Sequence, residues 1–447
     1  MSSIKKPKPS MDVVREKGAA VFELMSKFSA VDEKGRYLHW HDFRHRVPSG
    51  TDAEAAWAAV KMSRSVMLKP TGLLAESGAP FRYCLPDSAQ TVIHKIDHLN
   101  AKLGTSVSSS SSPSESNYYL VESLMMEEAI SSAQLEGAAT TRKVAKEMLE
   151  KERDPVNDDE RMIFNNFILM KEAKHSKDKP LSVELIRQFH TEATRGVDEK
   201  NACPGEIRKS DDIYVKGRDN EVAHQPPSAN HLPSRLEALC NFANEQHDGQ
   251  DGRIFVHPAV KAIMLHFMIG YEHPFNDGNG RTARCLFYWF MLKSGYWGFE
   301  YISISTLLKN APIQYGESYL FTETDDFDLT YFICHQLKII ERAIDEFLQY
   351  IEKKRSDFYN ILEFLSESGF NKDLNFRQVH LLKKVIRNPG RLFSAKEVKN
   401  DFDISEGTAR ADLEKLHKLK LLAKTRDGKT HYYIARDDAM AQIKRKK

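Results

Sequence analysis

The feature that most constrains the fold is a polar, glycine-rich stretch set between two apolar helical patterns. The first pattern covers 257–272 and ends at His273-Pro274, where proline cannot continue a helix. The second resumes after Gly280 and comprises Leu286, Phe287, Phe290 and Met291. Apolar residues at this spacing predict two core helices joined by the loop 273–284, whose glycines lead into the second helix. The chain is strongly helical in pattern after residue 117, so a mainly α-helical protein is expected.

This loop offers several groups that bind phosphate. The first N–H groups of a helix have no partner inside the helix, and the helix dipole is positive there, so anions bind at such ends. Glycines at 278 and 280 let the backbone approach an anion closely. Arg281 and Arg284 can reach its outer oxygens with forked, charge-assisted hydrogen bonds.

The loop also offers chemistry to act on the phosphate. His273 stands one loop-width away, where a general base would accept the proton of an incoming hydroxyl. Asp277 is a hard oxygen ligand, suited to Mg²⁺ brought in by a nucleotide. The pattern therefore indicates transfer of a phosphorus-containing group to a hydroxyl.

The loop resembles the signature of the Fic family, His-x-Phe-x-(Asp/Glu)-Gly-Asn-Gly-Arg-x-x-Arg, and every fixed position of that signature is present in 273–284. The resemblance implies a Fic-type helical core with a β-hairpin flap. It also implies transfer of AMP from ATP, with Mg²⁺, to a Ser, Thr or Tyr hydroxyl of a target protein. His273 would be the catalytic base, and the implied nucleotide-binding residues of the loop are Asp277, Gly278, Asn279, Gly280, Arg281, Thr282, Ala283 and Arg284.

A helical pattern over 118–135 ends in the hexapeptide Ser132 to Gly137. Gly137 suits a helix C-cap, which is the ordinary interpretation of this end. The hexapeptide also resembles the (Ser/Thr)-x-x-x-Glu-(Gly/Asn) inhibitory motif of Fic proteins that carry their inhibitory helix before the catalytic core. By that resemblance Ser132, Glu136 and Gly137 are inhibitory, and Glu136 would pair with Arg284.

Short alternating runs around a polar turn predict a β-hairpin over 213–224. In a Fic-like protein this hairpin is the flap, whose edge could hold a target segment by strand addition. An ordinary surface hairpin is the alternative. The resemblance places Glu221, Val222, Ala223 and His224 against the nucleotide, and Tyr315 near its base, although Gly316 stands where relatives usually have a second tyrosine.

The remaining pattern divides the chain into four parts. These are an N-terminal region 1–104, a serine-rich linker 105–117, a catalytic domain 118–370 with the inhibitory helix 118–137, and a C-terminal unit 371–447. Helices are expected at 53–65, 88–103, 140–152, 159–175, 182–195, 233–247, 303–310, 327–346 and 348–368, and an extended stretch at 37–47.

The C-terminal unit resembles a winged helix-turn-helix domain. Helices are expected at 376–387, 394–401 and 405–419, followed by a hairpin with a basic tip. The unit holds 20 Lys and Arg against 10 Asp and Glu, whereas the whole chain has a net charge of +2. This surplus favours duplex DNA as a partner, with Thr408 and Arg410 in the major groove and Lys429 on a phosphate, although many such domains bind proteins.

Five dispersed cysteines without close pairing predict free thiols, and no apolar stretch is long enough to span a membrane. The protein is therefore expected to be cytoplasmic, and a homo-oligomer stays open. The main alternative function is a DNA-binding regulator that senses nucleotide. A Fic enzyme that uses another donor, or one that removes AMP, is a further alternative.

Overall fold

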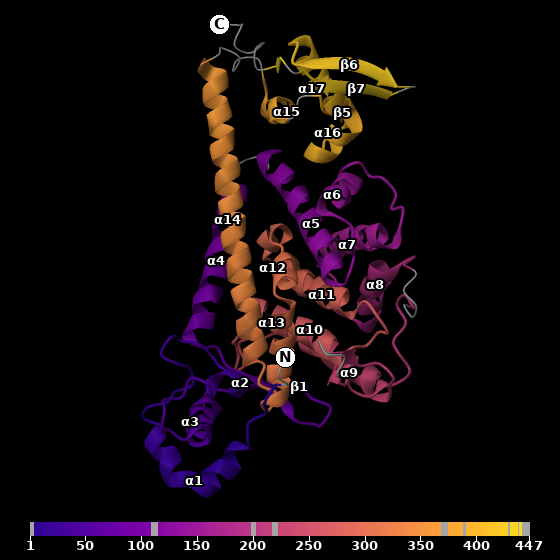
Figure 1. Cartoon of the computed structure of the whole chain (residues 1–447). Coiled ribbons are helices and arrows are strands. Elements are labelled where there is room, and N and C mark those ends of the chain that lie inside the picture. Colours follow the sequence, from indigo (N-terminus) through magenta and orange to yellow (C-terminus); the bar gives the residue numbers. More distant parts are fainter. Residues whose placement is uncertain are drawn as a thin grey trace.

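The structure is a computed structural model that describes residues 4–108, 115–197, 203–216, 222–367, 374–387, 390–427, 430–436 and 438–439. It is mainly helical, as the sequence predicts, with three small antiparallel sheets among the described residues (Figure 1).

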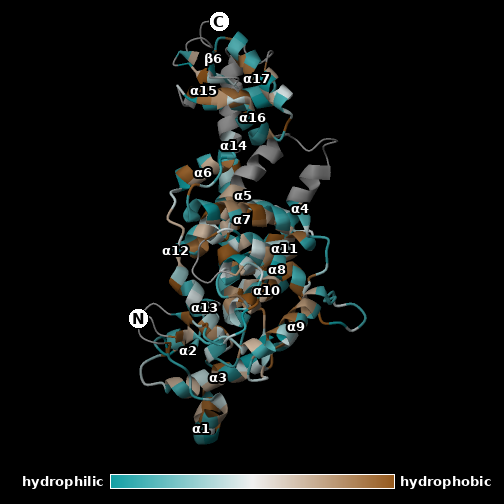
Figure 2. Ribbon diagram, turned by 90° about the vertical axis from the view of Figure 1, so that its right-hand side faces the viewer, coloured by the Kyte–Doolittle hydropathy of each residue, from teal (hydrophilic) through white to brown (hydrophobic). Residues whose placement is uncertain are grey.

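The predicted helix pair lies at the centre of the molecule. It consists of α10 (Pro258–Glu272) and α11 (Asn279–Lys293), which pack against each other and are buried along almost their whole length. Figure 2 shows the apolar residues gathered around these two helices. The second helix starts earlier than its apolar residues indicate, because it includes the buried arginines at 281 and 284.

Other helices surround this pair and share its core. Helices α7 and α8 pack on α11, and α9 packs on α10. Their bounds are α5 (Glu115–Leu135), α6 (Arg142–Glu150), α7 (Asp158–His175), α8 (Val183–Thr194), α9 (Leu232–Asn244), α12 (Ser305–Asn310) and α13 (Pro312–Thr324). The short 3-10 helices are η1 (Ala229–His231) and η2 (Trp297–Tyr301), and the flap strands are β3 (Val215–Lys216) and β4 (Val222–His224).

One continuous helix, α14 (Thr330–Glu367), replaces the two helices expected at 327–346 and 348–368. Its first part packs on α4, α10 and α13, and its far end reaches the C-terminal unit (Figure 1). No proline or glycine interrupts 330–367, so nothing in the backbone requires the break that we expected near 347.

The N-terminal region forms small helices and a hairpin, and its last helix joins the central core. The elements are α1 (Ser10–Leu24), α2 (Trp40–Phe43), α3 (Ala53–Ser65), β1 (Lys69–Leu74), β2 (Pro80–Tyr83) and α4 (Asp87–Ser108). The expectation of an extended stretch at 37–47 was wrong in part, because His39 accepts a hydrogen bond from the N–H of His41 and starts the short helix α2.

Buried charges attach this region to the start of α14. Arg64 is 1% exposed and donates to the Tyr331 hydroxyl at 2.7 Å and to two carbonyls of its own region. Lys61 lies 2.9 Å from Asp325 in a buried ion pair. Buried charges are stable only when paired, so these contacts fix the region to the core.

Of the linker expected at 105–117, residues 105–108 end α4 and 115–117 begin α5, while 109–114 lie outside the described residues.

The C-terminal unit has its own core and a three-stranded antiparallel sheet of order β5-β7-β6. Its elements are α15 (Phe376–Arg387), β5 (Leu392–Ser394), α16 (Ala395–Phe402), α17 (Glu406–Lys418), β6 (Leu422–Asp427) and β7 (Thr430–Ala435). The unit packs against α5 and α6, where Lys396 and Glu152 form an ion pair at 3.2 Å.

Within the described residues, every helix is too short or too polar to cross a membrane. All five cysteines are free thiols.

Candidate active site

The glycine-rich loop has a fixed shape. Gly278 has φ of +76°, a left-handed conformation that suits glycine, and α11 begins at the next residue. The Asn279 side chain accepts from the N–H of Phe275 at 3.0 Å and donates to its carbonyl at 2.7 Å. Thr282 donates its hydroxyl to the Gly278 carbonyl at 3.0 Å. The asparagine and the threonine are therefore used to hold the loop.

His190 of α8 supports the loop from beneath, and the sequence did not point to it. Its ring stacks on Phe275 with 3.7 Å between ring centroids. Nδ1 accepts from the N–H of Gly205 at 2.9 Å, so Nε2 carries the proton that is donated to the Asp277 carbonyl at 2.8 Å. Burial lowers the pKa of His190 to about 4, which keeps the ring neutral and able to make both bonds.

A side chain at 278 would also collide with this support. A Cβ there would lie 2.7 Å from the Thr194 methyl group and 3.2 Å from Nε2 of His190. His190 lies on the buried face of a helix that the sequence predicts. Nothing in 182–195 distinguishes it from an ordinary core histidine, so the sequence alone could not identify its role.

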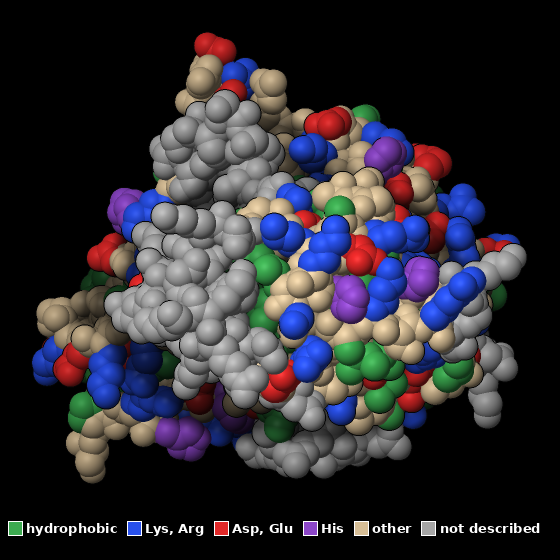
Figure 3. All heavy atoms as spheres, turned by 90° about the horizontal axis from the view of Figure 1, so that it is seen from above, with side chains coloured by type: hydrophobic (Ala, Val, Ile, Leu, Met, Phe, Trp, Pro, Cys, Tyr) green, Lys and Arg blue, Asp and Glu red, His purple; other side chains and the backbone are tan. Residues whose placement is uncertain are grey.

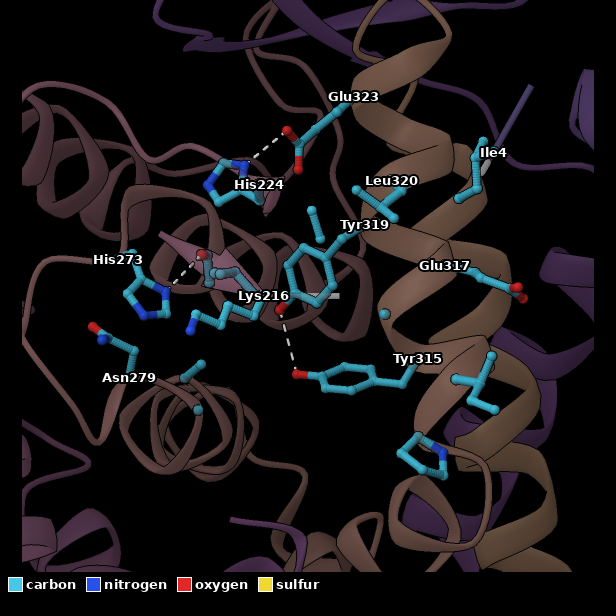
Figure 4. A pocket seen from close by; sticks show the side chains of 18 of the residues that line it. Ile4, Lys216, His224, His273, Asn279, Tyr315, Glu317, Tyr319, Leu320 and Glu323 are labelled. Atoms are coloured by element: carbon cyan, nitrogen blue, oxygen red, sulfur yellow. Dashed lines mark hydrogen bonds and ion pairs between the residues drawn. The ribbon is translucent and has the colours of Figure 1, made fainter. Parts of the chain in front are cut away.

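His273 ends α10 in a left-handed conformation with φ of +45°, which turns its ring toward the cavity (Figure 4). Its Nδ1 faces the Gly270 carbonyl at 3.4 Å, so a proton on Nδ1 leaves Nε2 as the acceptor. Burial lowers the pKa of His273 to about 4, with smaller contributions from His224 and Arg208 in the same direction. A neutral imidazole with a free acceptor nitrogen is the form that a general base requires.

Arg208 connects this turn to the segment before the flap. It is 4% exposed and donates to the carbonyls of His273 at 2.9 Å, of Ser210 at 2.9 Å and of Pro227. The backbone N–H of Arg208 donates to the Pro274 carbonyl at 2.9 Å. One guanidinium therefore holds both ends of the flap segment against the turn that carries His273.

Arg284 meets the end of α5. Its Nε donates to the Ser132 hydroxyl at 2.9 Å, and its Nη2 donates to the Ser132 carbonyl at 3.2 Å and to Oε1 of Glu136 at 2.8 Å. Nη1 is buried and lacks a hydrogen-bond partner among the described residues. Gly137, with φ of +108°, lets the chain leave the helix at this point.

Glu136 also lies directly over the glycine-rich loop. A Cβ at Gly280 would stand 2.3 Å from Oε1 of Glu136, so only glycine fits beneath this carboxylate. The carboxylate therefore occupies the space beside the loop where an anion would approach, and it is held there by an arginine that is 2% exposed.

Asp277 and Arg281 lie side by side at the start of α11. The Arg281 guanidinium is buried, donates to the Ala193 carbonyl at 2.9 Å and lies 3.7 Å from the Asp277 carboxylate. Asp277 accepts from the Gly278 N–H at 2.6 Å and has a side chain 45% exposed. Of the two arginines, only Arg284 reaches the Glu136 carboxylate above the loop.

Asp277 alone could hold Mg²⁺. The described residues contain no cluster of three or more His, Cys, Asp or Glu that would form a complete metal site. A single, partly exposed carboxylate nevertheless suits this ion, which usually keeps several waters and takes other ligands from substrate phosphates. The residues present therefore fit Mg²⁺ bound together with a nucleotide.

A cavity of about 480 Å³ opens beside the loop (Figure 4). Its lining includes the signature residues His273, Asn279, Gly280 and Ala283, together with Glu136. The flap contributes Val215, Lys216, Ala223 and His224, and α13 contributes Tyr315, Tyr319 and Glu323. Val222 is 56% exposed and is not part of the lining, and Glu221 lies outside the described residues.

Two tyrosines form one wall of this cavity. The Tyr315 hydroxyl lies 2.8 Å from Nε2 of the buried His266 and 3.3 Å from the Tyr319 hydroxyl. A Cβ at Gly270 would lie 2.5 Å from the Tyr319 hydroxyl, so the glycine allows the ring to approach α10. Tyr319 thus supplies a second tyrosine to the cavity, although the sequence places Gly316 beside Tyr315.

His224 closes the cavity on the flap side. Its Nε2 donates to the Tyr271 carbonyl at 2.7 Å, and its Nδ1 lies 2.8 Å from the Glu323 carboxylate (Figure 4). Burial lowers the pKa of His224, but the bonds to Glu323 and Tyr271 outweigh burial and raise it above its ordinary value. The pair joins the flap to α13.

Two of the residues expected to contact DNA, Thr408 and Arg410, lie on α17. Ser405 caps α17, as predicted, by accepting from the N–H of Thr408 at 3.1 Å. Arg410 is exposed and pairs with Glu406 at 2.9 Å. Lys429 lies outside the described residues.

Part of the chain that includes this loop is similar to proteins of a known family. Residues 180–291 match the model of the Fic/DOC family. The protein adenylyltransferase Fic of Aedes aegypti is 31% identical over 121 residues, which are 27% of this chain and 21% of that protein. The Drosophila virilis protein of the same name is 28% identical over 141 residues, 31% of this chain and 26% of that protein. The chain thus matches only about a quarter of these relatives' length.

Solved structures of Fic proteins are similar at low identity. A Fic family protein from Desulfovibrio desulfuricans aligns with a TM-score of 0.47 at 17% identity, over 77% of this chain and 95% of that one. Fic-1 from C. elegans aligns with a TM-score of 0.45 at 14% identity, over 77% of this chain and 86% of that one. The match over residues 180–291 includes the complete loop with His273 and Arg284, so this part of the chain is similar to the Fic/DOC family.

Proposed function

We propose that this protein transfers AMP from ATP to a Ser, Thr or Tyr hydroxyl of a target protein, with Mg²⁺, and that Glu136 inhibits the transfer. The observation that carries the proposal is one cavity that brings together a neutral His273, the glycine-rich start of α11 and the Glu136 carboxylate on Arg284. The relatives named protein adenylyltransferase support the same donor.

The reaction requires a hydroxyl oxygen to attack the α-phosphorus while pyrophosphate leaves. Nε2 of His273 accepts the hydroxyl proton as the new oxygen–phosphorus bond forms. The N–H groups at the start of α11, with Gly278 and Gly280 lacking side chains, hold the α-phosphate. Arg284 would bind an outer phosphate through the guanidinium that now holds Glu136.

Asp277 would hold Mg²⁺, which would supply positive charge to offset the negative charge of the nucleotide's phosphates. Arg281, fixed by the Ala193 carbonyl, keeps a positive charge near Asp277 and orders the carboxylate. Tyr315 and Tyr319 supply the cavity wall on which a base would pack. Ala223 and His224 of the flap complete the cavity, and its strand edge would position the target segment.

Inhibition follows from competition for Arg284. With Glu136 in place, the outer phosphates meet a carboxylate instead of a free guanidinium, so ATP would bind with its α-phosphate out of line. Ser132 holds the same guanidinium through its hydroxyl and its carbonyl, and Gly137 ends the helix that carries both. Transfer should therefore be slowed more than binding.

The test is the initial rate at which label from the α-phosphate of ATP is incorporated into the protein. Glu136→Gly should raise this rate at least tenfold, which corresponds to about 1.4 kcal/mol. Arg284→Ala in the same background should remove the gain. A Glu136→Gly protein no faster than wild type would refute the inhibitory role.

The same assay distinguishes the other reactions open to this site. Comparison of the four nucleoside triphosphates in the Glu136→Gly background identifies the donor. Loss of label from a protein that already carries AMP would show that the enzyme removes AMP. Absence of any transfer would favour a regulator that only senses nucleotide.

We also propose that residues 371–447 form a winged helix-turn-helix that binds duplex DNA. The support is the order α15, β5, α16, α17 and the β6–β7 hairpin, together with the basic surplus. Thr408 and Arg410 would contact bases and Lys429 a phosphate.

The free cysteines support a reducing, cytoplasmic compartment.

A further inference from the structure

A second carboxylate on α5, Glu128, lies in the core two helical turns before Glu136. It is 3% exposed. A carboxylate is normally buried only when hydrogen-bond donors surround it, so its partners must be found. Its partners belong to another part of the chain, the segment that begins α12. Neither the catalytic chemistry nor the pair formed by Glu136 uses this group.

Three donors converge on the Glu128 carboxylate. Ser303 donates its hydroxyl to Oε2 at 2.8 Å, and the backbone N–H of Ser305 donates to the same oxygen at 3.1 Å. The Ser305 hydroxyl donates to Oε1. Because Ser305 is the first residue of α12, Glu128 caps that helix from a distance and favourably meets the positive end of its dipole.

A neutral bond strengthens the same contact. The hydroxyls of Ser131 and Thr306 lie 2.9 Å apart, and Thr306 lies 2.8 Å from Ser303. Helix α5 is therefore joined to the start of α12 along one face, by Glu128 and Ser131, which lie one helical turn apart on α5, and by residues within 303–306 on the other side.

The spacing along α5 connects this contact to the inhibitory end. Residues 128, 132 and 136 follow one another at four-residue steps, so they lie along one side of the helical path. Ser132 and Glu136 both hold Arg284. Any rotation or shift of α5 that breaks the Glu128 contact also moves the two groups that hold Arg284.

We propose that Glu128 is a positioning residue for inhibition: by holding α5 on the start of α12, it places Ser132 and Glu136 on Arg284. This inference rests on the proposed inhibition by Glu136. It concerns a residue outside the hexapeptide, and it means that release of α5 from α12 relieves inhibition while Glu136 itself is intact.

The experiment measures label incorporation from the α-phosphate of ATP into the full-length protein. Glu128→Ala should raise the initial rate roughly tenfold, the change that about 1.4 kcal/mol of lost restraint produces. Glu128→Gln retains an acceptor for the Ser305 N–H, so it should give a smaller increase. Ser305→Ala removes one donor from the α12 side and should also raise the rate.

The neighbouring residue is a matched control. Glu127 lies on the same helix but pairs outward with Arg142 at 2.6 and 2.7 Å. Glu127→Gln therefore removes a carboxylate from α5 without touching α12, and its rate should equal that of wild type.

Combination with Glu136→Gly separates positioning from general stability. In that background Glu128→Ala should give no further increase, because there is no inhibitory carboxylate left to misplace. Its effect on the melting temperature should be the same in both backgrounds. Amide hydrogen exchange over 125–137 should be faster in Glu128→Ala whether or not Glu136 is present.

The outcomes distinguish the two proposals. If Glu136→Gly is activated but Glu128→Ala and Ser305→Ala are not, the positioning role is wrong and the inhibitory role stands. An equal increase from Glu128→Ala with and without Glu136 would place its effect on catalysis and overturn the inference. A Glu136→Gly protein no faster than wild type would remove the proposed inhibition itself.

Discussion

The two histidines at the glycine-rich loop are both neutral, and each uses that state differently. His273 exposes Nε2 to the cavity, whereas His190 uses both ring nitrogens to hold the backbone at 205 and 277. His273 could be predicted because it stands at a fixed place in a recognisable loop. His190 could not, since its role depends on α8 packing beneath the loop.

The low pKa of His273 has a measurable consequence. Because its pKa is lowered to about 4, the neutral base persists well below the ordinary value of about 6.5. For the Glu136→Gly protein we expect kcat/KM to stay nearly constant from pH 7.5 to about 5 and to fall below that. The measurement is the rate of label incorporation at low ATP concentration as a function of pH.

The control for this profile is His273→Ala, which should lose transfer by at least 1000-fold while ATP binding changes little. Equal losses of binding and transfer would indicate a structural role. If kcat/KM of the Glu136→Gly protein, with His273 intact, fell with a midpoint near pH 6.5, the lowered pKa of His273 would be contradicted.

At the scale of elements, apolar periodicity predicted most helices of the central core but missed α13. Helix α13 buries Ser318 and Thr322 and turns its tyrosines to the cavity, so no apolar stripe marked it. The first turns of α11 carry no apolar stripe because they bury arginines, and only the glycines before them indicated where the helix begins. In both cases the helix borders the candidate site, where polar side chains are buried because they serve the site and not the apolar core.

The C-terminal unit illustrates a second limit of prediction from sequence, because its net charge does not reveal which Lys and Arg side chains are paired with carboxylates. Lys and Arg side chains are interspersed with carboxylates on the face seen in Figure 3. Arg410, Lys424 and Arg391 each pair with a glutamate. DNA phosphates would have to compete with these carboxylates for the same cations.

We therefore expect DNA binding by the full-length protein to be weak and steeply dependent on salt. Arg410→Ala should reduce sequence preference more than Lys429→Ala, since the first would contact bases and the second a phosphate. Fluorescence anisotropy with a library of duplexes at low salt measures both effects. If wild type binds no duplex under these conditions, a protein partner for this unit is the better interpretation.

At the scale of the whole molecule, buried neutral histidines make folding sensitive to acid. Burial lowers the pKa of His39 and His266 to about 3 and that of His190 to about 4. The unfolded chain binds these protons near pH 6.5, so stability falls as the pH decreases below that value. Each residue costs on the order of 1 kcal/mol of folding stability at pH 5.5, and His224, whose pKa is raised, offsets part of the loss.

The urea midpoint of unfolding should consequently be lower at pH 5.5 than at pH 7.5, and His190→Gln should reduce the difference. An unchanged or higher midpoint at pH 5.5 would mean that these histidines are protonated in the folded protein.

Helix α14 runs without a break from the buried Tyr331, whose hydroxyl donates to the Asp325 carboxylate, to the C-terminal unit. Its 38 residues span about 57 Å, and only its first part is surrounded by the central core. A rod of this length acts as a lever arm: a tilt of about 5° at its base displaces its far end by about 5 Å. Because α13, which walls the cavity, packs on that base, we expect a small adjustment at the cavity to be magnified at the far end of α14.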